Sequence, residues 1–243
     1  MPKRTAKPTM APDRVQEFLN ELFADHMHAK RVLSLGNGVV GAIHAAALGV
    51  HAIGKALAVA AGLEPKYAIK QVDRLLSNMR LDVWALFPVW VRFLLSDRKE
   101  VVVALDWTDF DGDGHSTIAL NMTTSHGRAT PLMWKTHDKA KLAKCRNLYE
   151  DELLAYFRQI LPPDVRATVL ADRGFGDQAM YKALLGAQMD FVIRFRGCIH
   201  VTDAQDRTNT AAQLVPSSGR AKKFSNVRVT HARTPVPAVV CVK

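Results

Sequence analysis

The sequence predicts an α/β protein built on a mixed five-stranded sheet, in strand order 3-2-1-4-5. Three observations carry this prediction. The first hundred residues show helical periodicity, compact apolar runs of strand length follow, and a long helical segment separates two of those runs. We therefore expect a tail, a helical region, a sheet-based core and the start of a β-rich segment, at 1–10, 11–99, 100–197 and 198–243.

The charge of the chain indicates a polyanionic partner. The formal net charge is +10 and the pI about 9.7. Residues 1–100 carry a net +5 and 174–243 a net +6, whereas 101–173 carry −1. Nucleic acid is the usual partner of so basic a chain, although ribosome-associated and membrane-surface proteins share this composition. This distribution suits a nuclease, in which the basic flanking segments would hold phosphates and the mildly acidic central segment would hold metals.

The cysteines and the apolar stretches favour a cytoplasmic protein. The three cysteines show no CxxC spacing, so neither disulfides nor a zinc site is predicted. No apolar segment follows the basic start, which argues against a signal peptide. The most apolar stretch, 39–63, contains His44, His51 and Lys55 and makes a poor membrane span. We expect no membrane partner.

A basic helix is predicted in the N-terminal region. Residues 1–10 read as a disordered basic tail, and helical spacing begins near Pro12, with breaks at 36–38 and 62–65. Pro65 suits the first turn of a helix that runs to about residue 77. Lys66, Lys70 and Arg74 recur every four residues on one face of it. The pattern fits either a DNA-binding helix-turn-helix or an ordinary helical hairpin with a solvated basic face.

The core is predicted from its apolar runs and turns. Two hairpin-linked strands follow the first run, and a long helix ending at Pro162 separates them from a fourth strand, which favours parallel pairing of the first and fourth. The expected strands are 101–105, 116–124, 129–135, 166–171 and 190–196, and the expected helices are 141–161 and 178–185. This mixed sheet is the RNase H-like arrangement.

Two aspartates stand where chemistry is expected. Asp106 and Asp172 each follow an apolar strand, and parallel strands place their sites beyond the strand ends. Neighbouring carboxylates suit Mg²⁺ or Mn²⁺, and two such ions can activate an attacking oxygen and stabilise a leaving oxygen at a phosphodiester. The alternative is that both are helix caps or surface acids.

Several spaced motifs carry a resemblance to a known family. The chain resembles the IS4 family of DDE-type insertion-sequence transposases over about residues 15–243. The matching segments are LDWTDF at 105–110, LADRGFGD at 170–177, HGRATPL at 126–132, FVIRFRG at 191–197 and YAIKQVDRLLSN at 67–78.

The resemblance implies catalytic and metal-binding roles for Asp106 and Asp172, with two Mg²⁺ or Mn²⁺ ions in the family enzyme. It implies cleavage at the element ends and joining to target DNA, so the element ends and the target are both expected as double-stranded DNA partners. The resemblance also allows a homodimer in a synaptic complex. The third ligand of the family is a Glu in a downstream Tyr-x-x-Arg-x-x-x-Glu motif, which this sequence does not contain. We therefore expect a chain that stops inside the β-rich insertion and lacks this Glu. A non-catalytic DNA-binding inhibitor and a remnant without function are the alternatives.

Three other motifs are weighed against this interpretation. Residues 109–114 match half of an EF-hand loop, but Leu120 stands where the loop needs a Glu, so an acidic turn is expected. Residues 36–41 match a dinucleotide fingerprint without the required flanking strands. An aspartyl phosphatase needs two acids spaced by two, whereas Asp106 and Asp109 are spaced by three.

Further basic residues are candidates for DNA contact, and two tryptophans are candidates for the core. Arg194 and Arg196 are predicted on one face of the last core strand, where they would either hold a DNA phosphate or form plain surface. Arg173, beside Asp172, is a further DNA-contact candidate. Trp107 and Trp134 are expected in the core.

Overall fold

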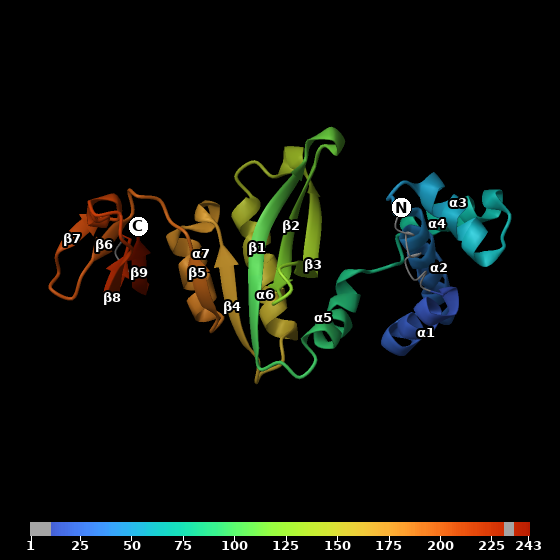
Figure 1. The fold of residues 1–243 in the computed structure, drawn as a ribbon, viewed down its shortest axis with the longest axis horizontal. Coiled ribbons are helices and arrows are strands. Elements are labelled where there is room, and N and C mark those ends of the chain that lie inside the picture. Colours follow the sequence, from blue (N-terminus) through green and yellow to red (C-terminus); the bar gives the residue numbers. More distant parts are fainter. Residues whose placement is uncertain (1–10, 231–235) are drawn as a thin grey trace, which may run out of the picture. The chain divides into compact units, whose positions relative to one another are not determined.

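The computed structural model describes residues 11–230 and 236–243, so the predicted tail at 1–10 lies outside the described residues. The chain forms two compact units, one up to Phe93 and one from Leu94 onward (Figure 1). Each is described separately below.

The first unit is helical, as the periodicity predicts. Its core is formed by apolar side chains from all four of the first helices, with Val32, Leu57, Ala68 and Val72 almost fully buried. The elements are α1 (Pro12–Phe23), α2 (Ala29–Ala45), α3 (Val50–Ala61), α4 (Pro65–Leu76), the 3-10 helix η1 (Trp84–Leu86) and α5 (Phe87–Leu95), which leads into the second unit.

The glycines at 36–41 lie inside α2, so the predicted break there is wrong. They serve close helix packing. A Cβ atom added to Gly41 would lie 2.6 Å from the carbonyl oxygen of Ile53, and one added to Gly38 would lie 2.6 Å from a methyl group of Leu75. Because tight packing compensates for the low helix propensity of glycine, α2 continues through them.

The apolar stretch at 39–63 spans parts of two helices. Within the described part of the chain no single helix is long and apolar enough to cross a membrane. α2 and α3 together have the length and apolar composition of a span, but they are bent by 98°.

The second unit contains the predicted mixed sheet, in the order β3-β2-β1-β4-β5. β1 pairs antiparallel with β2 and parallel with β4, and β4 pairs parallel with β5, as expected. The strands are β1 (Glu100–Phe110), β2 (His115–Thr123), β3 (Ala129–Asp138), β4 (Arg166–Ala171) and β5 (Asp190–Ile193), and the helices are α6 (Arg146–Ile160) and α7 (Gln178–Gly186).

Four predicted boundaries are wrong for reasons of pairing or backbone. β3 continues past residue 135 to Asp138, because its pairing with β2 runs to that residue. β1 continues past Leu105 to Phe110, because β2 pairs with it along that whole length. β5 stops at Ile193, the residue that pairs with Ala171 at the end of its partner β4. The helix predicted from 141 begins at Arg146, since a 3-10 turn (Lys139–Lys141) and the left-handed Lys144 (φ 63°) precede it.

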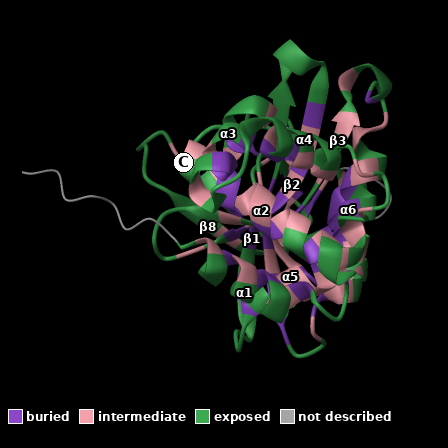
Figure 2. Ribbon diagram, turned by 90° about the vertical axis from the view of Figure 1, so that its right-hand side faces the viewer, coloured by how far each residue is buried: buried purple, intermediate pink, exposed green. Residues whose placement is uncertain are grey.

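One face of the sheet is covered by α6 and α7. Trp107 of β1 contacts Glu150 of α6, and Phe191 of β5 stacks on Tyr181 of α7 with ring centroids 5.5 Å apart. The strand register and the alternation of side chains put Trp107 and Phe191 on this same face. In Figure 2 the buried residues of β1, β2 and α6 are purple.

The described residues of the segment 198–243 are β-rich, as predicted. They form a second sheet in the order β7-β6-β8-β9. Its apolar face packs with Tyr181, Phe191 and Ile193 of the core. The strands are β6 (His200–Thr202), β7 (Thr208–Thr210), β8 (Lys222–Val229) and β9 (Val236–Val242), with a 3-10 helix η5 (Ala212–Leu214) between β7 and β8.

Candidate metal and DNA site

The two predicted aspartates occupy neighbouring positions of the central sheet. Leu105 of β1 and Ala171 of β4 are the last registered pair, so Asp106 and Asp172 stand one residue beyond it on adjacent parallel strands. Adjacent strands lie about 4.8 Å apart. The expectation that Asp106 ends its strand is wrong, because β1 continues to Phe110; it is the pairing with β4 that ends at this point.

Both aspartates lie on the same side of the sheet. Leu105 and Trp107 belong to the face covered by α6, so strand alternation places Asp106 on the opposite face. Asp172 keeps an extended backbone, with φ −82° and ψ −176°, so the alternation carries it to the side of Asp106. Both residues are exposed to solvent.

Local hydrogen bonds orient each carboxylate. Asp106 Oδ1 accepts from the backbone N–H of Trp107 at 2.9 Å. Asp172 Oδ1 accepts from the backbone N–H of Gly174 at 2.7 Å and caps the 3-10 helix η4 (Arg173–Phe175). Asp172 is therefore a helix cap, as the alternative interpretation predicts.

The arginine candidates differ in their distance from this pair. Arg194 follows β5 directly, and its backbone N–H donates to the carbonyl of Ala171 at 3.1 Å. Arg194 therefore stands beside Asp172. Asp106, Asp172 and Arg194 form a row across β1 and the ends of β4 and β5. Arg196 lies two residues further on, outside the strand in which it was expected, and Arg173 lies in η4; all three arginines are exposed.

The chemistry of these donors fits a hard divalent cation in part. Two carboxylates with open coordination positions suit Mg²⁺ or Mn²⁺, which bind oxygen ligands and retain waters. Among residues 11–230 and 236–243, however, no group of three or more His, Cys, Asp or Glu side chains is placed to hold one ion. Asp106 and Asp172 could thus provide two protein ligands.

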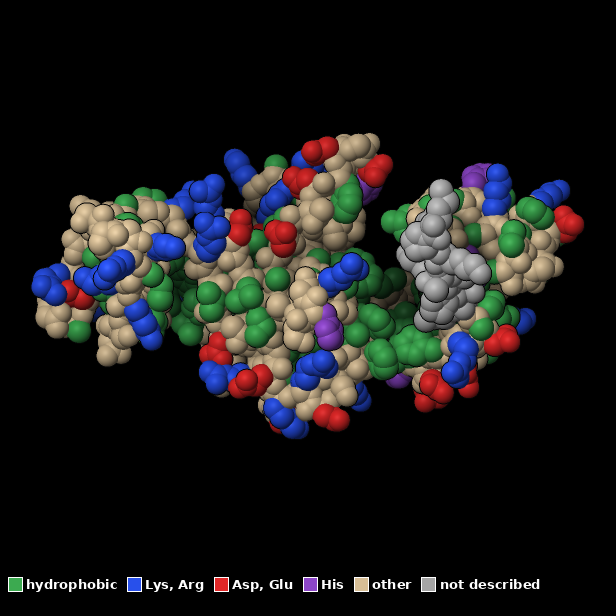
Figure 3. Space-filling model, viewed as in Figure 1, with side chains coloured by type: hydrophobic (Ala, Val, Ile, Leu, Met, Phe, Trp, Pro, Cys, Tyr) green, Lys and Arg blue, Asp and Glu red, His purple; other side chains and the backbone are tan. Residues whose placement is uncertain are grey.

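A polar network on the covered face holds the end of β1, and sequence reasoning missed it. The Trp107 Nε1–H donates to Glu150 Oε1 at 2.7 Å. Asp109 Oδ1 accepts from Ser116 Oγ at 2.6 Å and from Arg146 Nη2 at 3.0 Å. Figure 3 shows acidic and basic side chains together over the upper end of the central sheet, which is the C-terminal end of β1 in Figure 1.

The network shifts two carboxyl groups in opposite directions. Hydrogen bonds from Ser116 and Lys139, aided by the charge of Arg146, lower the pKa of Asp109 to about 2. Burial raises the pKa of Glu150 above its usual value, against the lowering effect of the Trp107 hydrogen bond. Spacing alone offered no signal for Glu150, because it is an acid within a helix rich in acids.

The basic helix forms where predicted. α3 ends at Ala61, Gly62 adopts a left-handed conformation (φ 63°), and α4 begins at Pro65. Lys66, Lys70 and Arg74 are all exposed on α4, whereas Ala68 and Val72 on its other face are buried. The three cations therefore form one exposed basic face on a short helix-turn-helix hairpin.

The other sequence motifs have structural roles. Residues 36–41 are helical, which excludes a strand-to-helix phosphate loop there. Residues 109–114 contain the expected acidic turn: Asp109 and Phe110 end β1, and the 3-10 helix η2 (Asp111–Asp113) and Gly114 lead into β2. Trp107 is half-buried, but Trp134 is 39% exposed, so the expectation of a core position is wrong for Trp134.

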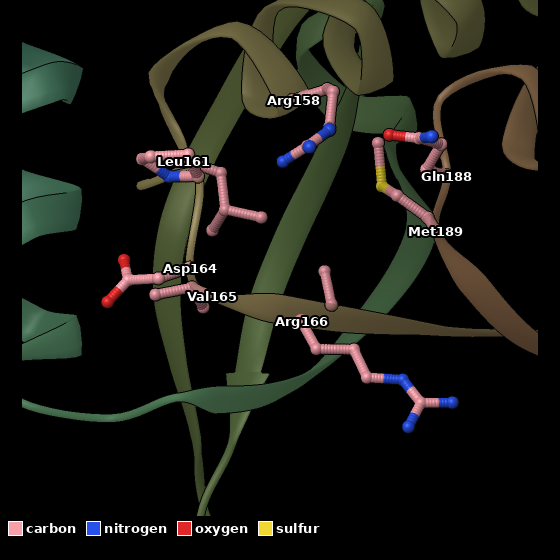
Figure 4. Close-up of a pocket in the computed structure, with 9 residues that line it drawn as sticks. Arg158, Leu161, Asp164, Val165, Arg166, Gln188 and Met189 are labelled. Atoms are coloured by element: carbon pink, nitrogen blue, oxygen red, sulfur yellow. The ribbon is translucent and has the colours of Figure 1, made fainter.

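A surface pocket lies at the opposite end of the sheet from the aspartates (Figure 4). Arg166, the first residue of β4, lines it and forms an ion pair with Asp190. In Figure 4 the Arg158 side chain reaches toward Leu161, whereas the guanidinium of Arg166 points away. Because Asp172 follows the other end of β4, this pocket is separate from the aspartate pair.

No protein-family model matches the chain, and no curated protein matches it significantly. The fold and the candidate site define a mixed α/β unit with two carboxylates just beyond the last registered pair of two adjacent parallel strands. The family resemblance rests on the sequence motifs.

Proposed function

We propose that this chain carries two of the three catalytic carboxylates of a DNA transposase of the cut-and-paste DDE type, related to the IS4 family and built on an RNase H-like core. The observation that carries the proposal is the adjacency of Asp106 and Asp172 at the end of the β1–β4 pairing. The basic helix α4 and the net charge of +10 support double-stranded DNA as the substrate.

The position of each candidate residue indicates its proposed role. Asp106 and Asp172 would hold Mg²⁺ or Mn²⁺, which supplies charge stabilisation at the phosphodiester when bound. Arg194, beside Asp172, would hold a phosphate oxygen of the strand that enters the site, and Arg173 would add a second cation next to Asp172. Lys66, Lys70 and Arg74 would bind the backbone of the duplex.

A second candidate function is a non-catalytic DNA-binding derivative that occupies element ends. One observation favours it: the described residues supply two carboxylates and no third ligand around them. DNA binding through α4 needs none of these ligands, so it would persist without catalysis.

Metal binding tests the proposed core. Mn²⁺ binding by the wild-type chain, measured by electron paramagnetic resonance, should weaken in both Asp106→Asn and Asp172→Asn. Asp113→Asn is the matched control, since Asp113 is an exposed acid in the turn after β1. Equal Mn²⁺ binding in all four proteins would contradict the proposal.

A further inference from the structure

The two buried polar side chains of the described chain both attach to the end of β1. Ser116 and Glu150 are the polar or charged residues buried in residues 11–230 and 236–243, at 0% and 8% exposure. Ser116 bonds Asp109, and Glu150 bonds Trp107. Both bonds therefore fix the covered face of the segment that begins at Asp106.

Glu150 connects to Asp106 through a single residue. The indole of Trp107 donates to Glu150 on the covered face, while the backbone N–H of Trp107 donates to Asp106 Oδ1. The guanidinium of Arg146 lies 4.9 Å from the centroid of the Trp107 ring and also donates to Asp109. Two residues of α6, Arg146 and Glu150, thus contact Trp107.

We propose that Glu150 is a positioning residue for Asp106, acting through Trp107. This inference rests on the proposed function, in which Asp106 is a metal ligand. A carboxylate in this position costs desolvation that an apolar side chain would avoid, so packing alone does not account for it. Glu150 provides a fixed hydrogen-bond acceptor that sets the orientation of the Trp107 indole. Through Trp107 it also sets the backbone N–H that orients the Asp106 carboxylate. Residues behind metal ligands commonly act this way, and their loss weakens metal binding about 10–100-fold.

Hydrogen–deuterium exchange of the full chain tests the positioning directly. In Glu150→Leu and in Trp107→Phe, the amides of residues 106–109 should exchange at least about tenfold faster, because the hydrogen bond that holds this segment is lost. Glu150→Gln keeps an acceptor oxygen and should restore slow exchange. Glu152→Leu is the matched control on the same helix, since Glu152 bonds Lys135 of β3 and not β1.

The exchange pattern decides the inference. Acceleration confined to 106–109 in both test variants supports it. Exchange equal to that of Glu152→Leu, or acceleration spread evenly over all five strands, would overturn it and leave Glu150 with a purely structural role.

Mn²⁺ affinity, measured on the same proteins, separates this inference from the function on which it rests. Affinity should fall about 10–100-fold in Glu150→Leu and Trp107→Phe and be retained in Glu150→Gln. A wild-type chain that binds no Mn²⁺ would refute the metal site, while exchange at 106–109 would still decide whether Glu150 positions the segment.

Discussion

Gly54 of α3 lies so close to Ile69 of α4 that a Cβ atom added to Gly54 would sit 2.5 Å from the Ile69 Cα. The two helices therefore cross at backbone contact. This contact sets how α4 presents its basic face relative to α3.

The contact predicts the effect of a larger residue at this position. Gly54→Leu should force the helices apart and lower the stability of the first unit by about 1–3 kcal/mol, as overpacking does. Chemical unfolding followed by circular dichroism measures this. Gly49→Ala is the control, since Gly49 has no neighbour within 4 Å of an added Cβ and a negative φ of −76°. Equal stability of the two variants would show that α3 and α4 do not pack as described.

The basic face of α4 should contribute phosphate contacts to DNA. Replacing Lys66, Lys70 and Arg74 together by Ala should weaken duplex binding and reduce the salt dependence by up to about three phosphate contacts. The measurement is fluorescence anisotropy with labelled duplex over a range of salt concentrations.

A charge-matched triple variant separates the effect of the position of the cations from the effect of the net charge. Arg14, Lys30 and Lys55 are exposed cations on α1, α2 and α3, and their joint change to Ala removes the same charge. An equal loss of salt dependence in both triple variants would refute the assignment of α4 as the DNA-binding helix.

The buried carboxyl of Glu150 predicts a pH trend in stability. Burial raises its pKa from the ordinary 4.5, so between 4.5 and the raised value the folded chain holds a proton that the unfolded chain releases. In this window the wild type should lose stability relative to Glu150→Gln as the pH rises. Urea unfolding of both proteins at about pH 4 and about pH 8 measures the difference. A difference that is flat, or that grows in favour of the wild type, would contradict the buried position of Glu150.

Residues 1–243 should not complete strand transfer. Two-metal phosphoryl transfer needs anionic ligands for both ions, and the described residues place two carboxylates together without a third. Misplacing a reacting group by about 1 Å can cost about a hundredfold in rate, so a loosely held ion would be inefficient. The assay is cleavage and joining of DNA that carries cognate ends, with Mg²⁺ or Mn²⁺. Robust joining that disappears in Asp106→Ala would show that a further ligand exists.

Local sequence signals were sufficient for the architecture of the core. β4 occupies residues 166–171 as predicted, because a short apolar run after two prolines has few alternatives. The order 3-2-1-4-5 follows from hairpin-length links on one side and a long helical crossover on the other. The adjacency of Asp106 and Asp172 follows from the same order. Their roles as metal ligands remain a prediction.

Only the tertiary structure decided features that depend on partners distant in the sequence. β1 extends to Phe110 because β2 pairs with its polar end, and α2 runs through its glycines because Gln16, Ile53 and Leu75 pack closely against them. The burial of Glu150 and its bond to Trp107 join residues 43 positions apart. Periodicity reports the face that a residue occupies on its own element, whereas pairing, close approach and burial are set by what other elements place against that face.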